Sequence, residues 1–123
     1  MSQLPAAAVD IPARVRLTVG AMLDRKARDL RVLDLSEVSD FTDYFLVSTG
    51  GSARQVRAVA DAVTETLRDR GHRPLHVEGY EHGQWVLMDY GDFLVHIFSE
   101  PQREYYRLER LWADAPDVTA EFR

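Results

Sequence analysis

Apolar residues recur at helical spacing in the first part of the chain and predict a helix from about residue 10 to residue 28. Pro12 fits the first turn of this helix, where its missing amide is tolerated. Two runs of branched and aromatic side chains follow, LRVLDLS at 30–36 and DYFLVST at 43–49, and predict strands separated by a polar turn. The residues of the helical stripe are Ile11, Val15, Val19, Met22 and Leu23.

The next helix is marked by residues that favour its two ends. Ser52 and Gln55 match a capping box at its start, and Gly71 can adopt the left-handed backbone conformation that ends a helix. The pattern therefore predicts a helix that begins after Ser52 and ends near Gly71. The apolar stripe between these ends consists of Val56, Val59, Ala60, Val63 and Leu67.

The second half of the chain is predicted to be mostly extended. Residues 73–79 (RPLHVEG) read as a strand that starts after Pro74. Residues 85–89 and 93–98 are two further apolar runs, and the DYGD sequence between them predicts a tight reversal. Gly91 can supply the positive φ angle that such a reversal needs. These two runs are therefore predicted to form a hairpin.

A last helix is predicted after Ser99, which suits an N-cap, with Pro101 in the first turn. Residues 113–123 are expected to be a loose tail, because Pro116 prevents the helix from continuing. The apolar side of this helix would be formed by Tyr105, Leu108, Leu111 and Trp112.

The predicted order of elements is helix, two strands, helix, three strands and helix. This order is typical of an α/β domain, here with a five-stranded mixed sheet and three helices. A chain of 123 residues suits one domain of this kind. We expect a flexible leader at residues 1–10, a single domain at 11–113 and a C-terminal tail at 114–123.

Both faces of the predicted hairpin are apolar, so both must be covered. Three helices are expected to cover one face well, which leaves the other face as a candidate docking surface. Tryptophan, tyrosine and arginine are the usual anchors of such surfaces. The alternative is that all these side chains belong to the core. Alternation divides the first strand into Trp85, Leu87 and Asp89 on one face and Val86, Met88 and Tyr90 on the other.

Composition and charge narrow the classes of partner. The chain has no cysteine, which excludes disulfides and thiolate metal sites. Its net charge of -5 disfavours wrapping of nucleic acid and is compatible with a basic protein partner. The N-terminal residues lack the pattern of a signal peptide, and no apolar run is long enough to span a bilayer. A cytoplasmic location without membrane contact is therefore expected.

Two kinds of phosphate chemistry are suggested by the sequence TGGSARQV at 49–56, which joins a strand to a helix through two glycines. Backbone amides at such a helix start can hold a phosphate group, although cap and turn geometry explains the same residues. A nucleotidyltransferase would need paired acidic residues to hold magnesium ions, and Asp61 stands alone on the following helix. The other candidate acids, in loops and turns, are Asp40, Asp43, Asp89 and Asp92.

A metal site and a hydrolase site are the remaining chemical alternatives. His76, Glu78 and His82 could contribute to a metal site, which would still need a further ligand from His96 or a carboxylate. No serine or threonine lies in the sequence context of a catalytic nucleophile. We therefore expect no catalytic residue, no metal and no cofactor.

Two long blocks resemble one protein family. EGYEHGQWVLMDYGDFLVHIF followed by REYYRLERLW, together with SDFTDYFLVSTGGSARQVRAVADAV upstream, is similar to the signature of the ribosomal silencing factor family, also called Iojap or RsfS. The resemblance covers roughly residues 14–115. The order and spacing of the two blocks make it specific.

The resemblance implies a function without catalysis. Members of that family bind the large ribosomal subunit through its fourteenth protein, on the face that meets the small subunit, and their bulk blocks subunit joining and represses translation. Organellar relatives are also linked to large-subunit maturation. The implied fold is similar to that of nucleotidyltransferases but lacks their catalytic acids. Free members tend to form homodimers, and little direct contact with nucleic acid is expected.

The resemblance also implies which residues contact the partner. The docking tryptophan of the family falls on Trp85, and an apolar turn residue falls on Tyr90, where some relatives have leucine. Leu87, Asp89 and Tyr106 are further candidates. Asp89 could pair with an arginine or lysine of a basic ribosomal protein.

Overall fold

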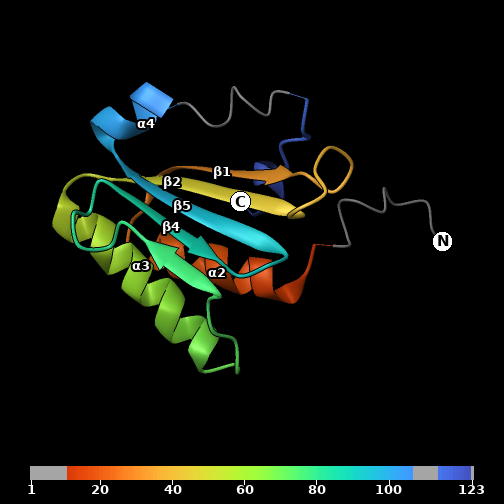
Figure 1. Ribbon diagram of the computed structural model, residues 1–123, viewed down its shortest axis with the longest axis horizontal. Helices are drawn as coiled ribbons and strands as arrows, with labels where there is room; N and C mark the ends of the chain where they lie inside the picture. Colours follow the sequence, from red (N-terminus) through yellow and green to blue (C-terminus); the bar gives the residue numbers. More distant parts are fainter. Residues whose placement is uncertain (1–10, 107–113, 123) are drawn as a thin grey trace.

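The computed structural model describes residues 11–106 and 114–122, and Figure 1 shows the arrangement of their helices and strands. The described elements are α2 (Ala13–Asp24), β1 (Arg28–Asp34), β2 (Tyr44–Gly50), α3 (Ala53–Arg68), β3 (His76–Glu78), β4 (Trp85–Asp89), β5 (Phe93–Ser99), α4 (Glu100–Tyr106) and the 3-10 helix η1 (Thr119–Phe122).

The five strands form one sheet in the order β1-β2-β5-β4-β3. β2 and β5 are parallel, and the other neighbouring strands are antiparallel. The chain leaves β2 through α3, forms the outer strands β3 and β4, and returns as β5 to the centre of the sheet. The prediction of an α/β domain with a five-stranded mixed sheet is confirmed.

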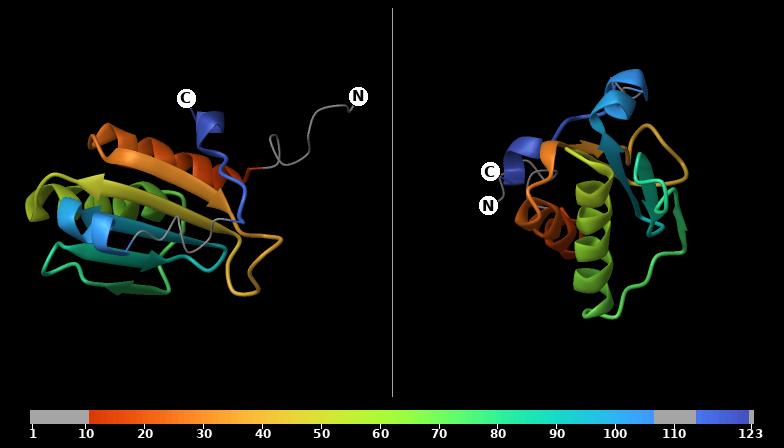
Figure 2. Two further views of the ribbon diagram at one scale, coloured as in Figure 1. Left: turned by 90° about the horizontal axis from the view of Figure 1, so that it is seen from above. Right: turned by 90° about the vertical axis from the view of Figure 1, so that its left-hand side faces the viewer.

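The helices α2 and α3 pack side by side against one face of the sheet (Figure 1). The main core lies between them and the sheet and includes fully buried Val15, Val63 and Ile97. A second apolar cluster lies on the opposite face and includes Leu33, Phe45 and Phe98. We call this opposite face the outer face. α4 leaves the end of β5 away from α2 and α3, as Figure 1 and the right-hand view of Figure 2 show.

The predicted ends of α3 and of the hairpin are confirmed. Ser52 accepts a hydrogen bond from the amide of Gln55 (3.1 Å), and the side chain of Gln55 accepts one from the amide of Gly51 (2.6 Å). Gly71, just beyond α3, and Gly91, in the reversal between β4 and β5, both have positive φ angles of 84° and 89°.

Two predicted elements are shorter in the structure. α2 ends at Asp24, because the chain turns sharply at Lys26, whose φ angle is 63°. β3 has three residues, whereas the sequence predicts a strand over 73–79. His76, Val77 and Glu78 pair with β4, the amide of Leu75 donates to the carbonyl of Asp89, and Gly79 leaves the extended conformation with a φ angle of 82°.

The expectation of a loose tail is wrong for residues 114–122. The amide of Asp34 donates to the carbonyl of Pro116 (2.9 Å), and the amide of Val118 donates to the carbonyl of Val32 (2.8 Å). The hydroxyl of Thr119 is buried and accepts from the amide of Val32 (2.9 Å). This segment therefore pairs with the edge of β1 that β2 leaves open, and β1 is covered on both sides.

Other predictions lie outside the described residues. They concern the leader at 1–10 and the apolar side of the last helix, including Leu108, Leu111 and Trp112. The division of the chain at residues 10 and 113 thus stays a prediction. Within the described part of the chain, no helix has the length and apolar character needed to cross a membrane.

Candidate functional site

The residues of β4 alternate between the two faces of the sheet, as the sequence predicts. Val86 and Met88 are buried in the core beneath α2 and α3. Trp85, Leu87 and Asp89 point to the outer face, and each is only partly buried. Three of the five predicted contact residues thus lie in one row on the same strand, on the face that α2 and α3 do not cover.

An aromatic cluster surrounds Trp85 on the outer face. We define it as Phe45 on β2, Trp85 on β4, and His96 and Phe98 on β5. The rings of Trp85 and Phe98 stack with centroids 5.0 Å apart, and Phe45 meets His96 edge to face at 4.7 Å. The register of the sheet produces these contacts, because Trp85 lies opposite Phe98 and His96 lies opposite Leu87. Aromatic pairs of this kind contribute about 0.5–1.5 kcal/mol beyond their buried area.

His96 forms the polar contact within this cluster. Its Nδ1 atom accepts a hydrogen bond from the indole Nε1–H of Trp85 at 3.1 Å. Burial lowers the pKa of His96 from 6.5 to about 3, so the ring is neutral at physiological pH. An indole nitrogen only donates, so Nδ1 carries no proton and the proton of the neutral ring lies on Nε2.

The buried neutral His96 should make stability depend on pH. Because its pKa is lower in the folded chain than in the unfolded chain, the unfolded chain binds the extra proton, and the free energy of unfolding falls as pH drops from 6.5 toward about 3. At pH 5 the expected loss from this group is about 2 kcal/mol. Urea denaturation at pH 7.5 and pH 5 measures this loss of unfolding free energy in wild type and in His96→Asn, which lacks the buried histidine. Equal losses in the two proteins would contradict the assignment.

Asp89 lies at the end of this row, and its Oδ1 atom accepts a hydrogen bond from the amide of Gly91 at 2.8 Å. On the neighbouring edge strand, His76 lies opposite Asp89 and Glu78 lies opposite Leu87. Glu78 is exposed and sits 2.5 Å from Nε2 of His76. The apolar row of Trp85 and Leu87 is therefore bordered by the carboxylates of Glu78 and Asp89, a border suited to a basic partner.

Tyr90 does not lie on this surface but on the other face of the sheet, as the alternation along the strand predicts, and its role as a contact residue stays a prediction. It follows Asp89 in an alternating strand and therefore points to the helix side of the sheet. Its ring is buried and stacks on Phe93 with centroids 5.1 Å apart. Burial raises the pKa of its hydroxyl. Tyr90 therefore packs in the main core on the helix side of the hairpin and does not point to the outer face.

The last predicted contact residue is Tyr106, the final residue of α4. This helix contacts β5 and β2 at the end of the sheet, but the side chain of Tyr106 lies outside the described part of the structure. Phe45, His96 and Phe98 were not among the predicted contact residues, and His96 was named as a candidate only for a metal site. The signal was present in the period-two pattern of β5, which places His96 and Phe98 on the same face.

The glycine turn before α3 is explained by its own hydrogen bonds. The amides of Gly51 and Gln55 are used within the capping box described above. A side chain at Gly50 would meet Val56 at 2.8 Å, which gives that glycine a packing reason. Nothing further in the geometry of the turn indicates a phosphate ligand.

The metal and transferase alternatives gain no support in the described part of the chain. No group of three histidine, aspartate or glutamate side chains there is arranged to hold a metal ion. Asp61 accepts a hydrogen bond from the hydroxyl of Tyr80 at 2.8 Å. His76 contacts the carboxylate of Glu78, and His96 accepts a hydrogen bond from Trp85 on the outer face.

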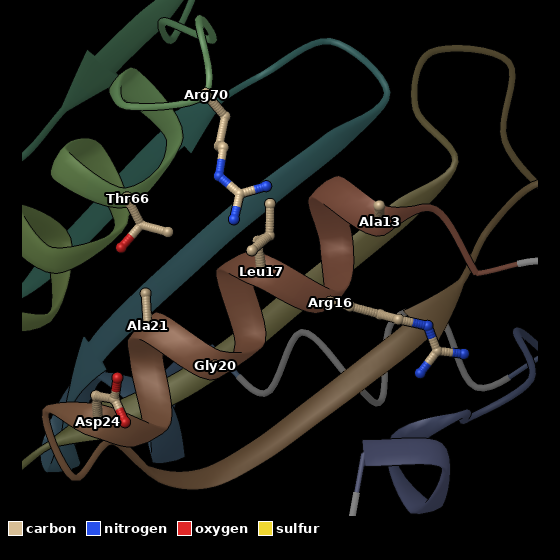
Figure 3. A pocket seen from close by; sticks show the side chains of 8 residues that line it. All are labelled: Ala13, Arg16, Leu17, Gly20, Ala21, Asp24, Thr66 and Arg70. Atoms are coloured by element: carbon tan, nitrogen blue, oxygen red, sulfur yellow. The ribbon is translucent and has the colours of Figure 1, made fainter.

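A groove of about 490 Å³ runs along α2 and α3, on the side of the molecule away from the outer face (Figure 3). Its apolar lining consists of Leu17 and the small residues Ala13, Gly20 and Ala21. Arg16 extends out of the groove toward the C-terminal segment, where its guanidinium lies 5.6 Å from the ring centre of Phe122, whereas Arg70 points toward Leu17. The charged groups do not converge, so the groove is not a convincing ligand site.

Comparisons with known proteins agree with the resemblance of the two sequence blocks. The family described as "Ribosomal silencing factor during starvation" matches residues 8–123. The chain is 40% identical over 107 residues to a ribosomal silencing factor of Halalkalibacterium halodurans, covering 87% of this chain and 92% of that protein. It is 28% identical over 101 residues to a mouse protein named "Mitochondrial assembly of ribosomal large subunit protein 1", covering 80% of this chain and 44% of that protein.

The fold is also similar to a solved structure. A crystal structure of a protein from Chromobacterium violaceum superposes with a TM-score of 0.79 at 38% sequence identity. The match covers 81% of this chain and 83% of that one.

Proposed function

We propose that this chain, which belongs to the ribosomal silencing factor family, represses translation by binding the large ribosomal subunit and blocking its union with the small subunit. The proposal rests on one observation: Trp85 and Leu87 are partly exposed on the outer face, beside two carboxylates. Such a face can hold a protein partner through a few apolar anchors without changing it chemically.

The proposed contact is the fourteenth protein of the large subunit, on the face that meets the small subunit. A basic surface on that protein would meet Glu78 and Asp89, and the net charge of -5 would assist the approach. An interface of about 1,600 Å² in total is typical of specific complexes. Repression would then follow from steric exclusion, because the bound chain and the small subunit compete for one surface. The proposal includes a cytoplasmic site of action.

The proposal includes the absence of an enzymatic activity. The rival is a nucleotidyltransferase, for which turnover of a nucleotide in the presence of magnesium would be the evidence. Loss of such turnover on replacing Asp89 or Asp92 would establish the rival and overturn the proposal. Thermal protection by phosphate or nucleotide, centred on the turn at 50–52, would instead indicate a small-ligand module.

A second candidate function is a part in the maturation of the large subunit. It is favoured by the printed name of the mouse relative, which concerns assembly of that subunit in mitochondria. Both functions need the same contact with the large subunit. They differ in the species that is bound, a mature subunit for silencing and an incomplete particle for maturation.

Dimer formation through the outer face would compete with ribosome binding. Stacking the apolar row of one chain on that of another would cover Trp85 in the free protein. Sedimentation velocity of wild type and Trp85→Ala at several concentrations tests this. We expect a concentration-dependent dimer for wild type only, and an unchanged dimer in the variant would place the contact elsewhere.

The decisive experiment is co-sedimentation with purified large subunits, followed by addition of small subunits. We expect wild type to travel with large subunits and to reduce the yield of joined ribosomes in proportion to its occupancy. In this assay Leu23→Ala is the matched control for Trp85→Ala. Leu23 is also an exposed apolar residue, but it lies at the end of α2, on the opposite side of the sheet. Failure of the wild-type chain to sediment with large subunits would refute the proposal.

A further inference from the structure

His96 occupies an unusual position for a polar side chain. It is only 4% exposed and lies among the aromatic rings of the outer face. Its Nε2 atom is buried and has no hydrogen-bond partner in the described part of the chain. A leucine or phenylalanine would fill the same space without burying an unpaired N–H group. The polar ring therefore calls for an explanation that filling the core does not provide.

The other ring nitrogen provides that explanation. Nδ1 accepts the indole hydrogen of Trp85, and Trp85 is a diagonal neighbour across the β4–β5 pair, with ring centres 6.0 Å apart. We infer that His96 is a positioning residue, whose Nδ1 atom fixes the orientation of the Trp85 indole on the outer face. This first part of the inference does not depend on the proposed function. A second part, that the partner contacts the indole fixed in this way, rests on the proposed function.

The acceptor is itself held in place. Phe45 meets the ring of His96 edge to face at 4.7 Å, and Phe98 lies parallel to it with ring centres 6.1 Å apart. A ring packed in this way has little freedom to rotate about its side-chain bonds. The hydrogen bond therefore ties a partly exposed side chain, Trp85, to a rigid and buried one.

Fixing the indole in advance would favour binding. Trp85 is large and only partly buried, and a stacking contact such as that with Phe98 does not by itself select one direction for the indole N–H. A directional hydrogen bond selects one orientation, because it requires the indole nitrogen to face Nδ1. A partner then does not have to order the anchor when it binds, and affinity rises accordingly.

Two replacements of His96 separate positioning from packing. His96→Phe keeps a ring of similar size and removes the acceptor. His96→Asn loses ring contacts but keeps an acceptor oxygen near the position of Nδ1. The chain has two tryptophans, so Trp112→Phe assigns the indole signal of Trp85 in a protein labelled with ¹⁵N at its tryptophans.

The readouts are the indole N–H chemical shift, its hydrogen exchange, and the affinity for purified large subunits. In His96→Phe we expect indole exchange to accelerate at least about tenfold and affinity to fall about tenfold, as for loss of one net hydrogen bond. We expect His96→Asn to retain part of the indole protection and part of the affinity that His96→Phe loses. Loss of a mere packing contact would give the opposite order, with the asparagine variant the more impaired.

Three results would overturn the inference. An unchanged indole shift and exchange in His96→Phe would show that His96 does not hold Trp85. A changed indole with unchanged affinity, while Trp85→Ala abolishes binding, would remove the positioning role in recognition. If the phenylalanine variant fails to fold, ¹⁵N shifts of the histidines in wild type decide, and a proton on Nδ1 of His96 at pH 7 would contradict the assigned hydrogen bond.

Failure of the proposed function gives a different pattern. In that case wild type itself does not bind large subunits, whereas the indole measurements still report whether His96 holds Trp85. The hydrogen-bond part of the inference is therefore decided without a ribosome, and the recognition part falls together with the proposed function.

Discussion

Replacing Trp85 by alanine is expected to weaken binding to the large ribosomal subunit by at least about 30-fold, which corresponds to about 2 kcal/mol. Central aromatic anchors lose this much on truncation because the partner pocket is left unfilled. Trp85 is the largest side chain of the β4 row and lies partly exposed between Leu87 and the stacked ring of Phe98. The measurement is co-sedimentation across a range of subunit concentrations.

The fold should survive this replacement. Trp85 is only partly buried, so its loss removes the stack on Phe98 and the bond to His96 but opens no closed cavity in the main core. The free energy of unfolding should therefore fall by less than a core truncation, which costs about 3–5 kcal/mol for an aromatic residue. A collapse of the melting transition together with binding would instead mean that Trp85 is a core residue and that the docking face is misassigned.

Replacing Gly79 by alanine is expected to lower the free energy of unfolding by about 3 kcal/mol or more. Gly79 has a φ angle of 82°, and a Cβ atom there would lie 2.0 Å from the carbonyl oxygen of Trp85. That atom belongs to the backbone, so no side-chain rotation relieves the overlap. The end of β3 would have to move away from β4, and we expect weaker binding as well because β4 carries the proposed anchors.

Gly71→Ala is the matched control for this prediction. Gly71 has a nearly identical φ angle of 84°, but a Cβ atom there would meet nothing within 4 Å. Its replacement should cost only the left-handed conformation, about 1–2 kcal/mol, and should leave binding unchanged. Urea denaturation of both variants isolates the contribution of the close approach to Trp85. Equal losses at the two positions would argue that the overlap is relieved without cost.

Much of the fold was predictable because it depends on local patterns. The capping box at Ser52 and Gln55 and the reversal at Gly91 are short-range features, and both are confirmed. The ends of α2 and β3 were misplaced because they depend on single backbone conformations, at Lys26 and at Gly79. The packed segment at 114–122 was missed because it pairs with a strand about 85 residues away, and no local pattern encodes such a contact.

The candidate site was likewise predictable where it depends on a local pattern. Alternation alone placed Trp85, Leu87 and Asp89 on one face of β4, and the structure agrees. The same alternation placed Tyr90 on the other face, and only the family resemblance suggested it as a contact residue. In the structure Tyr90 lies on that other face, where it is buried in the main core, and its role as a contact residue stays a prediction.

The sequence by itself determined the class of fold, the caps of α3, the hairpin and the identity of the family, because each follows from residues that are close together or from two long blocks in fixed order. Only the tertiary structure decided which apolar face α2 and α3 cover, and so which one keeps Trp85 partly exposed. It also decided that His96 meets the indole of Trp85. Both outcomes depend on the register between strands, which is fixed when the whole sheet assembles and its helices pack.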